Sequence, residues 1–205
     1  MFAWFETRIN PFPPERPAQA PRRLLAFFWH YTRDIWPWLA LTSVLTAVIS
    51  ILQVLIFAFL GNIVDWLAGA DRETFLAEEG WALFWMGLVI VVGLPLTGLF
   101  HSLIMHQTIF GNFPMIIRWK AHRYMLGQSM GYYQDEFAGR IATKVMQAAL
   151  GVRESVTKVV DIFIYVGVYF GGALVLVATL QAWLMLPFLL WLAAYIVLMW
   201  HYLPK

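Results

Sequence analysis

The chain contains no cysteine, which excludes disulfide bonds, thiolate nucleophiles and thiolate metal sites. It is also poor in charge, because only 13% of its 205 residues are Asp, Glu, Lys or Arg, whereas a soluble globular domain carries about 25%. In contrast, 61% of the residues are hydrophobic. The 11 Trp and 8 Tyr gather near the ends of the apolar runs, as amphipathic rings do at the headgroup level of a bilayer. This composition predicts an all-α, polytopic membrane protein.

Residues with catalytic potential do not form a useful pattern either. The sequence has no Gly-x-x-x-x-Gly-Lys-Ser/Thr loop, so we do not expect this chain to bind and hydrolyse ATP by itself. His101 and His106 stand five positions apart, with no Glu beside the first, so the zinc-protease pattern fails. We expect both histidines to lie unpaired near the inner membrane boundary. No catalytic residue, metal site or nucleic-acid partner is predicted.

The N-terminal 36 residues predict two segments outside the membrane core. Residues 1–21 lack the basic start and apolar run of a secretory signal and are broken by Pro11, Pro13, Pro14, Pro17 and Pro21. Because proline excludes helix interiors, we expect a mostly irregular cytoplasmic arm. In residues 22–36 apolar residues recur at helical spacing with basic residues on other faces, which predicts an interfacial elbow helix. Alternatively these are the first turns of the next helix, although Pro37 favours a break.

Four apolar runs are long enough to span a bilayer. The first has about 23 residues without a formal charge, which at about 1.5 Å per residue crosses a hydrocarbon core of roughly 30 Å. An acidic stretch at 61–80 separates the first two runs and reads as an outer loop. The predicted spans are 38–60, 81–103, about 140–180 (with 162–180 in the bilayer) and 183–203.

The second and third spans are expected to continue far beyond the bilayer. Pro95 predicts a kink within the second span. Its helix should run on to about residue 130, with a bend at Gly111 and Pro114. The return helix of the third span should begin just after Gly139. The region between the spans is therefore predicted to be a long helical hairpin.

The distribution of Lys and Arg predicts the orientation. Five lie in residues 1–37, one in 61–80, seven in 104–161 and none in the 181–182 turn. Such residues are retained on the cytoplasmic side of a membrane. We therefore expect both termini and the hairpin to be cytoplasmic, in a cell (inner) membrane.

The tip of the hairpin carries a recognisable order of residue types. A paired aromatic, three polar residues and a glycine that opens a helix with Ile, Thr and a basic residue occur here as Tyr132-Tyr133, Gln134-Asp135-Glu136, Gly139, Ile141, Thr143 and Lys144. In these residues and in its topology, the chain resembles the transmembrane half of ATP-binding-cassette (ABC) exporters. Ala148-Ala149 depart from that pattern, because many members carry Asp or Asn there.

The resemblance implies that residues 132–138 form the first coupling helix, which docks on a nucleotide-binding domain. It gives this role to Tyr132, Tyr133, Gln134, Asp135, Glu136, Phe137, Gly139 and Arg140. On physical grounds, Gly139 could supply a positive φ or a close backbone approach. The aromatic residues could form an interface anchor. Alternatively, the aromatic cluster only packs the tip against its own stems.

Other polar and small residues fall within the spans. If the helices line a transport cavity, the candidates to face it are Gln53, His101, Tyr165 and Tyr169. An apolar, aromatic cavity suits a lipid or an amphipathic drug. Gly167 and Gly171 form a Gly-x-x-x-Gly face for helix packing. Asp161 is expected to pair with Lys158 one turn earlier, or to contact a proton or a cationic substrate.

We therefore interpret the chain as part of an ABC exporter that moves a lipid-like or amphipathic substrate. The resemblance implies that ATP and Mg²⁺ bind in a nucleotide-binding domain outside this chain. It also implies further membrane helices and a dimer of half-transporters, so the chain looks like a fragment. The alternative is a non-transporting scaffold whose basic hairpin binds a cytoplasmic partner or anionic lipid.

Overall fold

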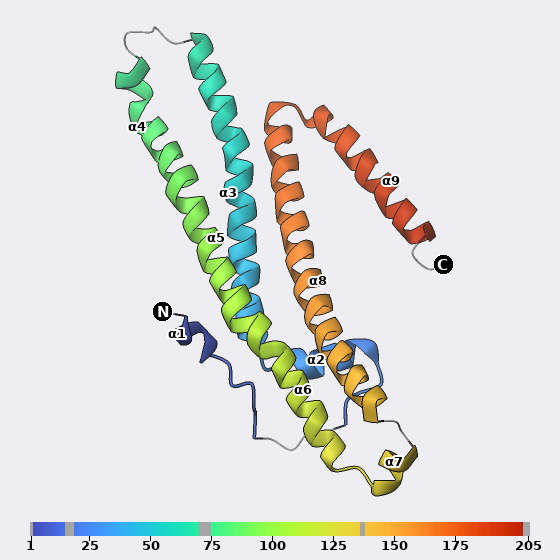
Figure 1. Cartoon of the computed structure of the whole chain (residues 1–205). Helices are drawn as coiled ribbons and strands as arrows, with labels where there is room; N and C mark the ends of the chain where they lie inside the picture. The colour runs from blue at the N-terminus through green and yellow to red at the C-terminus, as the bar shows by residue number, and fades with distance from the viewer. Residues whose placement is uncertain (1, 15–18, 70–74, 136–137, 203–205) are drawn as a thin grey trace. The chain divides into compact units, whose positions relative to one another are not determined.

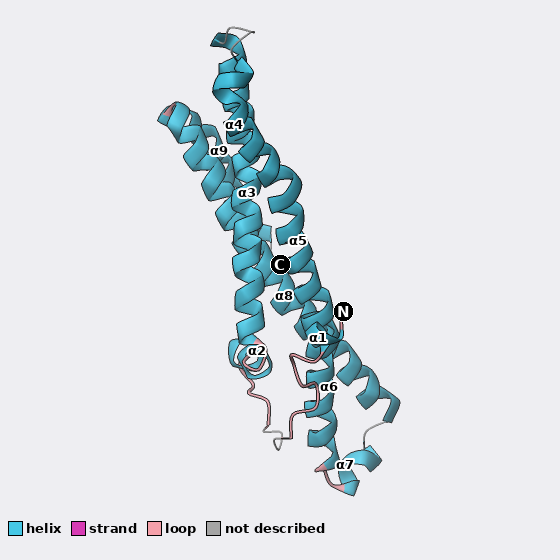
Figure 2. Cartoon of the chain, turned by 90° about the vertical axis from the view of Figure 1, so that its left-hand side faces the viewer, coloured by secondary structure: helices cyan, strands magenta, loops and turns pink. Residues whose placement is uncertain are grey.

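A computed structural model gives the fold and describes residues 2–14, 19–69, 75–135 and 138–202. Within these ranges the chain is almost entirely helical and has no strand (Figure 2). Four helical stretches in the described residues are long and apolar enough to cross a membrane, namely Trp36–Ala68, Phe75–Leu126, Gly139–Leu180 and Ala182–Tyr202. The prediction of an all-α, polytopic membrane protein is confirmed.

The helices follow one another with few interruptions (Figure 1). In chain order they are α1 (Ala3–Glu6), α2 (Leu24–Thr32), α3 (Trp36–Gly69), α4 (Phe75–Leu88), α5 (Leu94–Leu103), α6 (Gly111–Leu126), α7 (Met130–Asp135), α8 (Ala138–Leu180) and α9 (Leu186–Tyr202). Two π-helical segments, η1 (Val89–Gly93) and η2 (Ile104–Phe110), join α4 to α5 and α5 to α6. A 3-10 turn, η3 (Ala182–Met185), precedes α9.

The chain divides into two compact units. The first unit comprises Met1–Thr46 and Leu96–Ile164, and the second comprises Ala47–Pro95 and Tyr165–Lys205. The first unit therefore holds the N-terminal arm, α2, the start of α3, most of α5, α6, α7 and α8 as far as Ile164. The second holds most of α3, α4, the rest of α8 and α9.

Each π-helical segment precedes a proline. In an α-helix the N–H of residue i bonds the carbonyl of residue i−4. Proline has no N–H, so Pro95 cannot donate a hydrogen bond to the carbonyl of Val91, and Pro114 cannot donate one to the carbonyl of Phe110. Both carbonyls lie inside a π-helical segment, where the longer i to i+5 bonding changes the register. The N–H of Leu94 bonds the carbonyl of Val89 in this way. The helix thus continues through both prolines and ends at Leu126, four residues before the predicted end.

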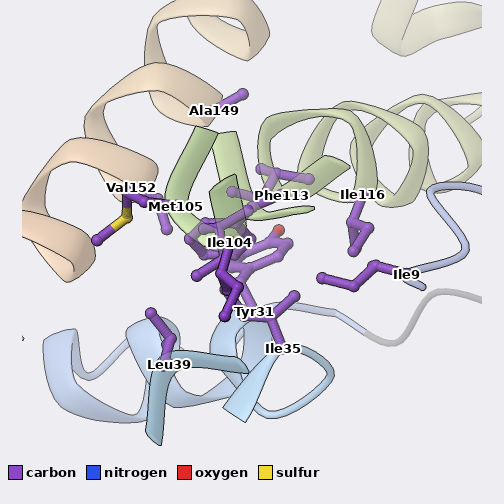
Figure 3. Close-up of a cluster of buried hydrophobic side chains, with 12 residues drawn as sticks. Ile9, Tyr31, Ile35, Leu39, Ile104, Met105, Phe113, Ile116, Ala149 and Val152 are labelled. Atoms are coloured by element: carbon purple, nitrogen blue, oxygen red, sulfur yellow. The ribbon is translucent and has the colours of Figure 1, made fainter. Parts of the chain in front are cut away.

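The first unit is built around a buried apolar cluster (Figure 3). Phe113 on α6, Ile109 on η2 and Ile35 before α3 are completely buried at its centre. The cluster draws on the arm, α2, the start of α3, η2, α6 and α8, and its members are Ile9, Tyr31, Ile35, Leu39, Ile104, Met105, Ile109, Phe113, Ile116, Ile117, Ala149 and Val152. Burial of such side chains stabilises this unit by about 25 cal/mol per Å² of apolar surface removed from water.

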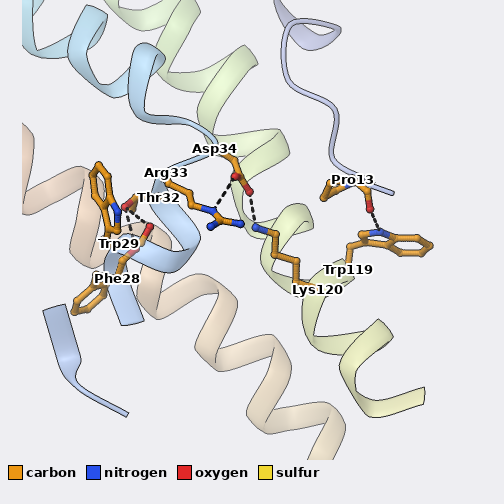
Figure 4. Close-up of polar contacts among 8 residues, drawn as sticks. All are labelled: Pro13, Phe28, Trp29, Thr32, Arg33, Asp34, Trp119 and Lys120. Carbon is orange, nitrogen blue, oxygen red and sulfur yellow. Dashed lines mark hydrogen bonds and ion pairs between the residues drawn. The ribbon is translucent and has the colours of Figure 1, made fainter. Parts of the chain in front are cut away.

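The N-terminal arm is more ordered than the sequence suggests. It opens with the short helix α1 and then lies against η2 and α6, whose side chains donate hydrogen bonds to its backbone. Asn112 Nδ2 bonds the Glu6 carbonyl at 2.9 Å, and Trp119 Nε1 bonds the Pro13 carbonyl at 3.0 Å (Figure 4). A proline lacks an N–H but keeps its carbonyl acceptor. Side-chain donors can therefore bind the backbone of a proline-rich segment through its carbonyl groups.

The elbow helix ends earlier than predicted. α2 stops at Thr32, whose hydroxyl donates to the Phe28 carbonyl at 2.9 Å, and the next membrane helix already begins at Trp36. The break therefore lies at residues 33–35 rather than at Pro37. Pro37 is compatible with the first turn of α3, because the N–H groups of a first turn have no partner within the helix.

The prediction of an outer loop over the whole of residues 61–80 is wrong. α3 continues to Gly69 and α4 begins at Phe75, which leaves 70–74 between them, outside the described residues. Apolar residues still recur beyond Gly61, and charged residues such as Asp65 can face water on an exposed helix surface. Both helices therefore extend past the predicted end of the bilayer.

The second unit contains a close helix contact at one glycine. A Cβ added at Gly172 on α8 would lie 3.1 Å from Cγ2 of Val54 on α3. At Gly167 and Gly171 no heavy atom of the described chain lies within 4 Å of an added Cβ. The close approach therefore falls at Gly172, and the packing role of Gly167 and Gly171 stays a prediction.

We expect Gly172→Leu to destabilise the helical fold by about 2 kcal/mol, because the larger side chain must displace Val54. Gly167→Leu should be neutral or stabilise by up to about 1 kcal/mol, since leucine is the better helix former and meets open space. The free energy of unfolding in detergent–denaturant titrations measures both. Equal effects of the two substitutions would contradict this packing.

Candidate functional site

The hairpin tip consists of a tight turn and a short helix. α6 ends at Leu126, where the backbone N–H groups of Gly127 and Gln128 bond carbonyls of its last turn at 3.2 and 2.9 Å. The helix α7 then spans Met130–Asp135, so its described part begins two residues before the predicted coupling helix of 132–138. Glu136 and Phe137, two of the predicted coupling residues, lie outside the described residues, and the side chain of Asp135 is not described.

The paired tyrosines of α7 are exposed and are also tied to their own stem. Tyr132 and Tyr133 keep 40% and 38% of their surface exposed, and their rings meet edge to face with centroids 5.5 Å apart. The hydroxyl of Tyr133 donates to the Met125 carbonyl at the end of α6, at 2.6 Å. The tip thus offers aromatic surface while one hydroxyl fixes its angle to α6. This geometry is compatible with both interpretations given for the cluster.

The remaining predicted coupling residues flank the tip. Gln134 is exposed in α7, and Gly139 and Arg140 are exposed in the first turn of α8. The Gly139 carbonyl accepts a bond of 2.9 Å from the hydroxyl of Thr143, as in a regular helix. None of the described glycines has a positive φ, and Gly139 lies in the first turn of α8, which begins at Ala138. The positive φ suggested for Gly139 is therefore wrong, whereas the close backbone approach stays a prediction.

Three of the four predicted cavity residues come together in the second unit. The hydroxyl of Tyr165 donates to Oε1 of Gln53 at 3.0 Å, which joins α8 to α3. The rings of Tyr165 and Tyr169 stack with centroids 5.5 Å apart. Tyr169 in turn lines a groove of about 740 Å³ between α3, α8 and α9. The groove is otherwise almost wholly apolar, with Phe57 and Trp191 among its lining residues.

His101, the fourth candidate, belongs to a polar cluster in the first unit. The Thr46 hydroxyl on α3 donates to Oδ1 of Asp161 on α8 at 2.5 Å and lies 3.1 Å from Nε2 of His101 on α5. The same His101 nitrogen is 3.5 Å from Oδ1 of Asp161. Three helices that are distant in sequence therefore share one polar contact.

This cluster corrects two expectations. His101 is not unpaired, and Asp161 does not pair with Lys158, whose ammonium instead lies 3.6 Å from Glu154. A carboxylate at the edge of a membrane span is costly without partners. It is therefore satisfied by donors from neighbouring helices rather than by a lysine that can reach water. His106 is exposed, and its ring makes an edge contact with that of Phe110.

The cluster is a set of polar contacts between helices. No group of three or more His, Asp or Glu side chains in the described part of the chain could hold a metal ion. The side chain of Asp161 remains 39% exposed and that of His101 20%. Asp161 is therefore partly open to its surroundings while Oδ1 is held.

We expect Thr46→Val and Asp161→Asn to be coupled by about 1 kcal/mol in a double-mutant cycle of unfolding free energy, because Thr46→Val removes the donor and Asp161→Asn replaces the charged acceptor by a weaker, neutral one. Thr42→Val is the matched control, since among the described residues the Thr42 hydroxyl, on the same helix, bonds only the Leu39 carbonyl. Its combination with Asp161→Asn should be additive within about 0.5 kcal/mol. Equal coupling in both cycles would show that the 2.5 Å contact does not join the helices.

Comparison with known proteins agrees with this architecture. The family described as "ABC transporter transmembrane region" matches residues 39–205. An "uncharacterized ABC transporter ATP-binding protein" of Haemophilus influenzae (strain ATCC 51907 / DSM 11121 / KW20 / Rd) is 37% identical over 205 residues. That alignment covers 100% of this chain and 33% of the relative, so the chain spans about a third of the relative's length. No solved structure matches.

The match begins in the first turn of α3 and includes every membrane-spanning helix, the hairpin tip and the polar cluster. It leaves out residues 1–38, which include the arm, α2 and the first residues of α3. The chain belongs to the ABC transporter transmembrane region family.

Proposed function

We propose that this chain is part of the transmembrane domain of an ATP-driven exporter, and that its substrate is lipid-like or amphipathic. The observation that carries the proposal is the hairpin, in which α6 and α8 continue from membrane-spanning helices to the exposed helix α7. Membership of the ABC transporter family supports the transport function. The apolar groove beside Tyr169 supports the substrate class, because such a surface binds apolar chains better than sugars or ions.

In this proposal α7 receives movement from a nucleotide-binding domain. α6 and α8 would transmit a displacement at the tip to the membrane helices as a rigid-body movement. The bond between Tyr133 and Met125 supports this role, since it fixes α7 to the end of α6. The arm braces the same stem through the bonds that Asn112 and Trp119 donate.

ATP and Mg²⁺ would bind outside these 205 residues, in the nucleotide-binding domain. The Haemophilus influenzae relative is named as an ATP-binding protein, and two thirds of its length lies outside the alignment with this chain. This supports such a domain as the partner. A dimer of half-transporters would complete the transport pathway in the bilayer.

Tyr133→Ala should lower the number of substrate molecules exported per ATP by about fivefold or more, because one aromatic anchor in an interface is often worth more than 1 kcal/mol. ATP-driven uptake of a fluorescent amphiphile into inside-out vesicles, measured with ATP hydrolysis, tests this in the full-length transporter. Met146→Ala, at an exposed position on the α8 stem, is the control and should leave the ratio unchanged.

An unchanged ratio in Tyr133→Ala would exclude α7 as the coupling element. If the wild-type protein inserts but drives no ATP-dependent uptake of any amphiphile, the scaffold alternative is favoured. The amount of protein in the membrane must be equal in all three samples, because a folding defect also lowers transport.

The orientation follows from the positions of Lys and Arg. We propose that the chain lies in the inner membrane, with α7 in the cytoplasm and the end of α3 and the start of α4 outside. A cysteine at Gln134 should react with a membrane-impermeant maleimide only after permeabilisation, whereas a cysteine at Glu78 should react in intact cells. The 205 residues contain no native cysteine, so each introduced thiol is unique in this part of the protein. The reverse labelling pattern would refute this orientation.

A further inference from the structure

A second groove lies in the first unit, between the elbow helix α2 and the helix α8. It has a volume of about 410 Å³, which falls within the range of ligand-binding pockets. Its lining is almost wholly apolar and contains no acidic residue. The two walls consist mainly of Leu25, Phe28 and Trp29 on α2 and of Val156, Val159 and Val160 on α8.

Both walls lie next to the points at which the chain enters the bilayer. α2 ends at Thr32, and the first membrane helix begins soon afterwards at Trp36. On the other wall, Val160 shortly precedes the uncharged run 162–180. The rings of Trp29 and Trp36 meet with centroids 5.7 Å apart, and tryptophan is enriched where headgroups meet acyl chains. These positions argue for a groove at headgroup level.

The apolar side chains on this side of α2 leave a large surface uncovered. Leu25 keeps 83% of its surface exposed and Trp29 keeps 55%, whereas Tyr31 on the same helix is buried in the core cluster. A helix that lies in the interface of a bilayer covers such a surface with acyl chains. Lipid is therefore the surrounding that suits this side of α2.

Basic side chains border the α2 wall. Arg22 and Arg23 directly precede α2 and are exposed, and their guanidinium groups form no ion pair or hydrogen bond within the described residues. Asp34, the acidic residue that follows α2, is held by Lys120 and lies 3.5 Å from Nε of Arg33 (Figure 4). The carboxylate beside α2 is therefore already engaged by other cations.

The α8 wall also carries basic groups beside the groove. Lys158 is next in sequence to Val159, and its side chain is 69% exposed. Its ammonium lies 3.6 Å from the Glu154 carboxylate, which also lies 3.2 Å from Arg153. Because two cations share this one carboxylate, the α8 wall has no excess of negative charge that would repel an anion.

We propose that this groove binds one anionic phospholipid of the surrounding leaflet. An acyl chain lies between the leucine and aromatic side chains of α2 and the valines of α8. The phosphate accepts charge-assisted hydrogen bonds from Arg22 or Arg23. A zwitterionic lipid has the same acyl chains, but its own ammonium offsets the phosphate charge, so the arginines favour the anionic lipid. The bound lipid joins the elbow helix to the stem of the hairpin.

Arg23→Gln tests the contribution of charge. In a native mass spectrometry titration of the detergent-purified, full-length transporter, phosphatidylglycerol should bind more tightly than phosphatidylcholine with the same acyl chains. Arg23→Gln should weaken phosphatidylglycerol binding by about fivefold, since each basic residue near an anionic headgroup contributes about that factor. Arg8→Gln is the matched control, because Arg8 is an exposed arginine of the same unit that stacks on Trp4 outside the groove. It should change the affinity by less than about twofold.

Ser155→Trp tests the groove itself. Ser155 is an exposed lining residue on α8, so an indole at this position occupies the space of the acyl chain. Ala148→Trp is the matched control, since Ala148 is exposed about two turns earlier on the same helix and lies outside the groove. Ser155→Trp should abolish the preference for phosphatidylglycerol, and Ala148→Trp should retain it.

The proposal is overturned if the wild-type protein binds both lipids equally, or if Arg8→Gln weakens binding as much as Arg23→Gln. It is also overturned if Ser155→Trp leaves the lipid preference unchanged. If Ser155→Trp instead dissociates the purified transporter into single copies, a second copy of the chain covers the groove and the lipid does not. None of these measurements requires transport, so their result is independent of the proposed function.

Discussion

The packing of Phe113 against Ile35 and Ile109 is the interaction on which the first unit depends. These three side chains are completely buried and bring together the junction of α2 with α3, the segment η2 and the start of α6. The π-helical bonding of η2 makes this possible, since Ile104 and Ile109 are five residues apart and yet both are buried in one cluster. A regular α-helix would rotate one of them away from that face. Pro114 thus has a structural role, because the π-helical register just before it places Ile104 and Ile109 on the same buried face.

The helices could be predicted from the sequence because lipid permits few alternatives. In a bilayer the backbone must satisfy its own hydrogen bonds, so long uncharged runs such as 38–60 can only be helices. Helix ends were harder to locate. Nothing in the bilayer argument stops α3 at residue 60, and the structure continues it to Gly69. At the hairpin tip, a short exposed helix has weak local preferences, and α7 begins two residues before its predicted start.

Contacts between residues that are far apart in the sequence could not be predicted from composition and spacing. The arm is rich in proline and was predicted to be mostly irregular, yet Asn112 and Trp119 hold its carbonyls across more than 100 positions of sequence. Likewise, the pairing of Asp161 with Lys158 was inferred from helical spacing alone. Helical spacing can suggest only a partner about one turn away. Thr46 lies 115 residues from Asp161 in the sequence, so this contact can be found only from the packing of the helices.

A signal for the polar cluster was nevertheless present in α3. Thr42, Thr46 and Ser50 follow one another at intervals of four residues, and all are buried, with 2%, 4% and 0% of their surfaces exposed. Small hydroxyl residues at this spacing form one face of a helix and allow neighbouring membrane helices to approach closely. Such a face, opposite an acidic residue on another span, predicts a hydrogen bond between helices rather than a salt bridge on one helix. Thr42 bonds its own backbone and Thr46 bonds Asp161, so within this face a contact with Asp161 is made by Thr46 and not by Thr42.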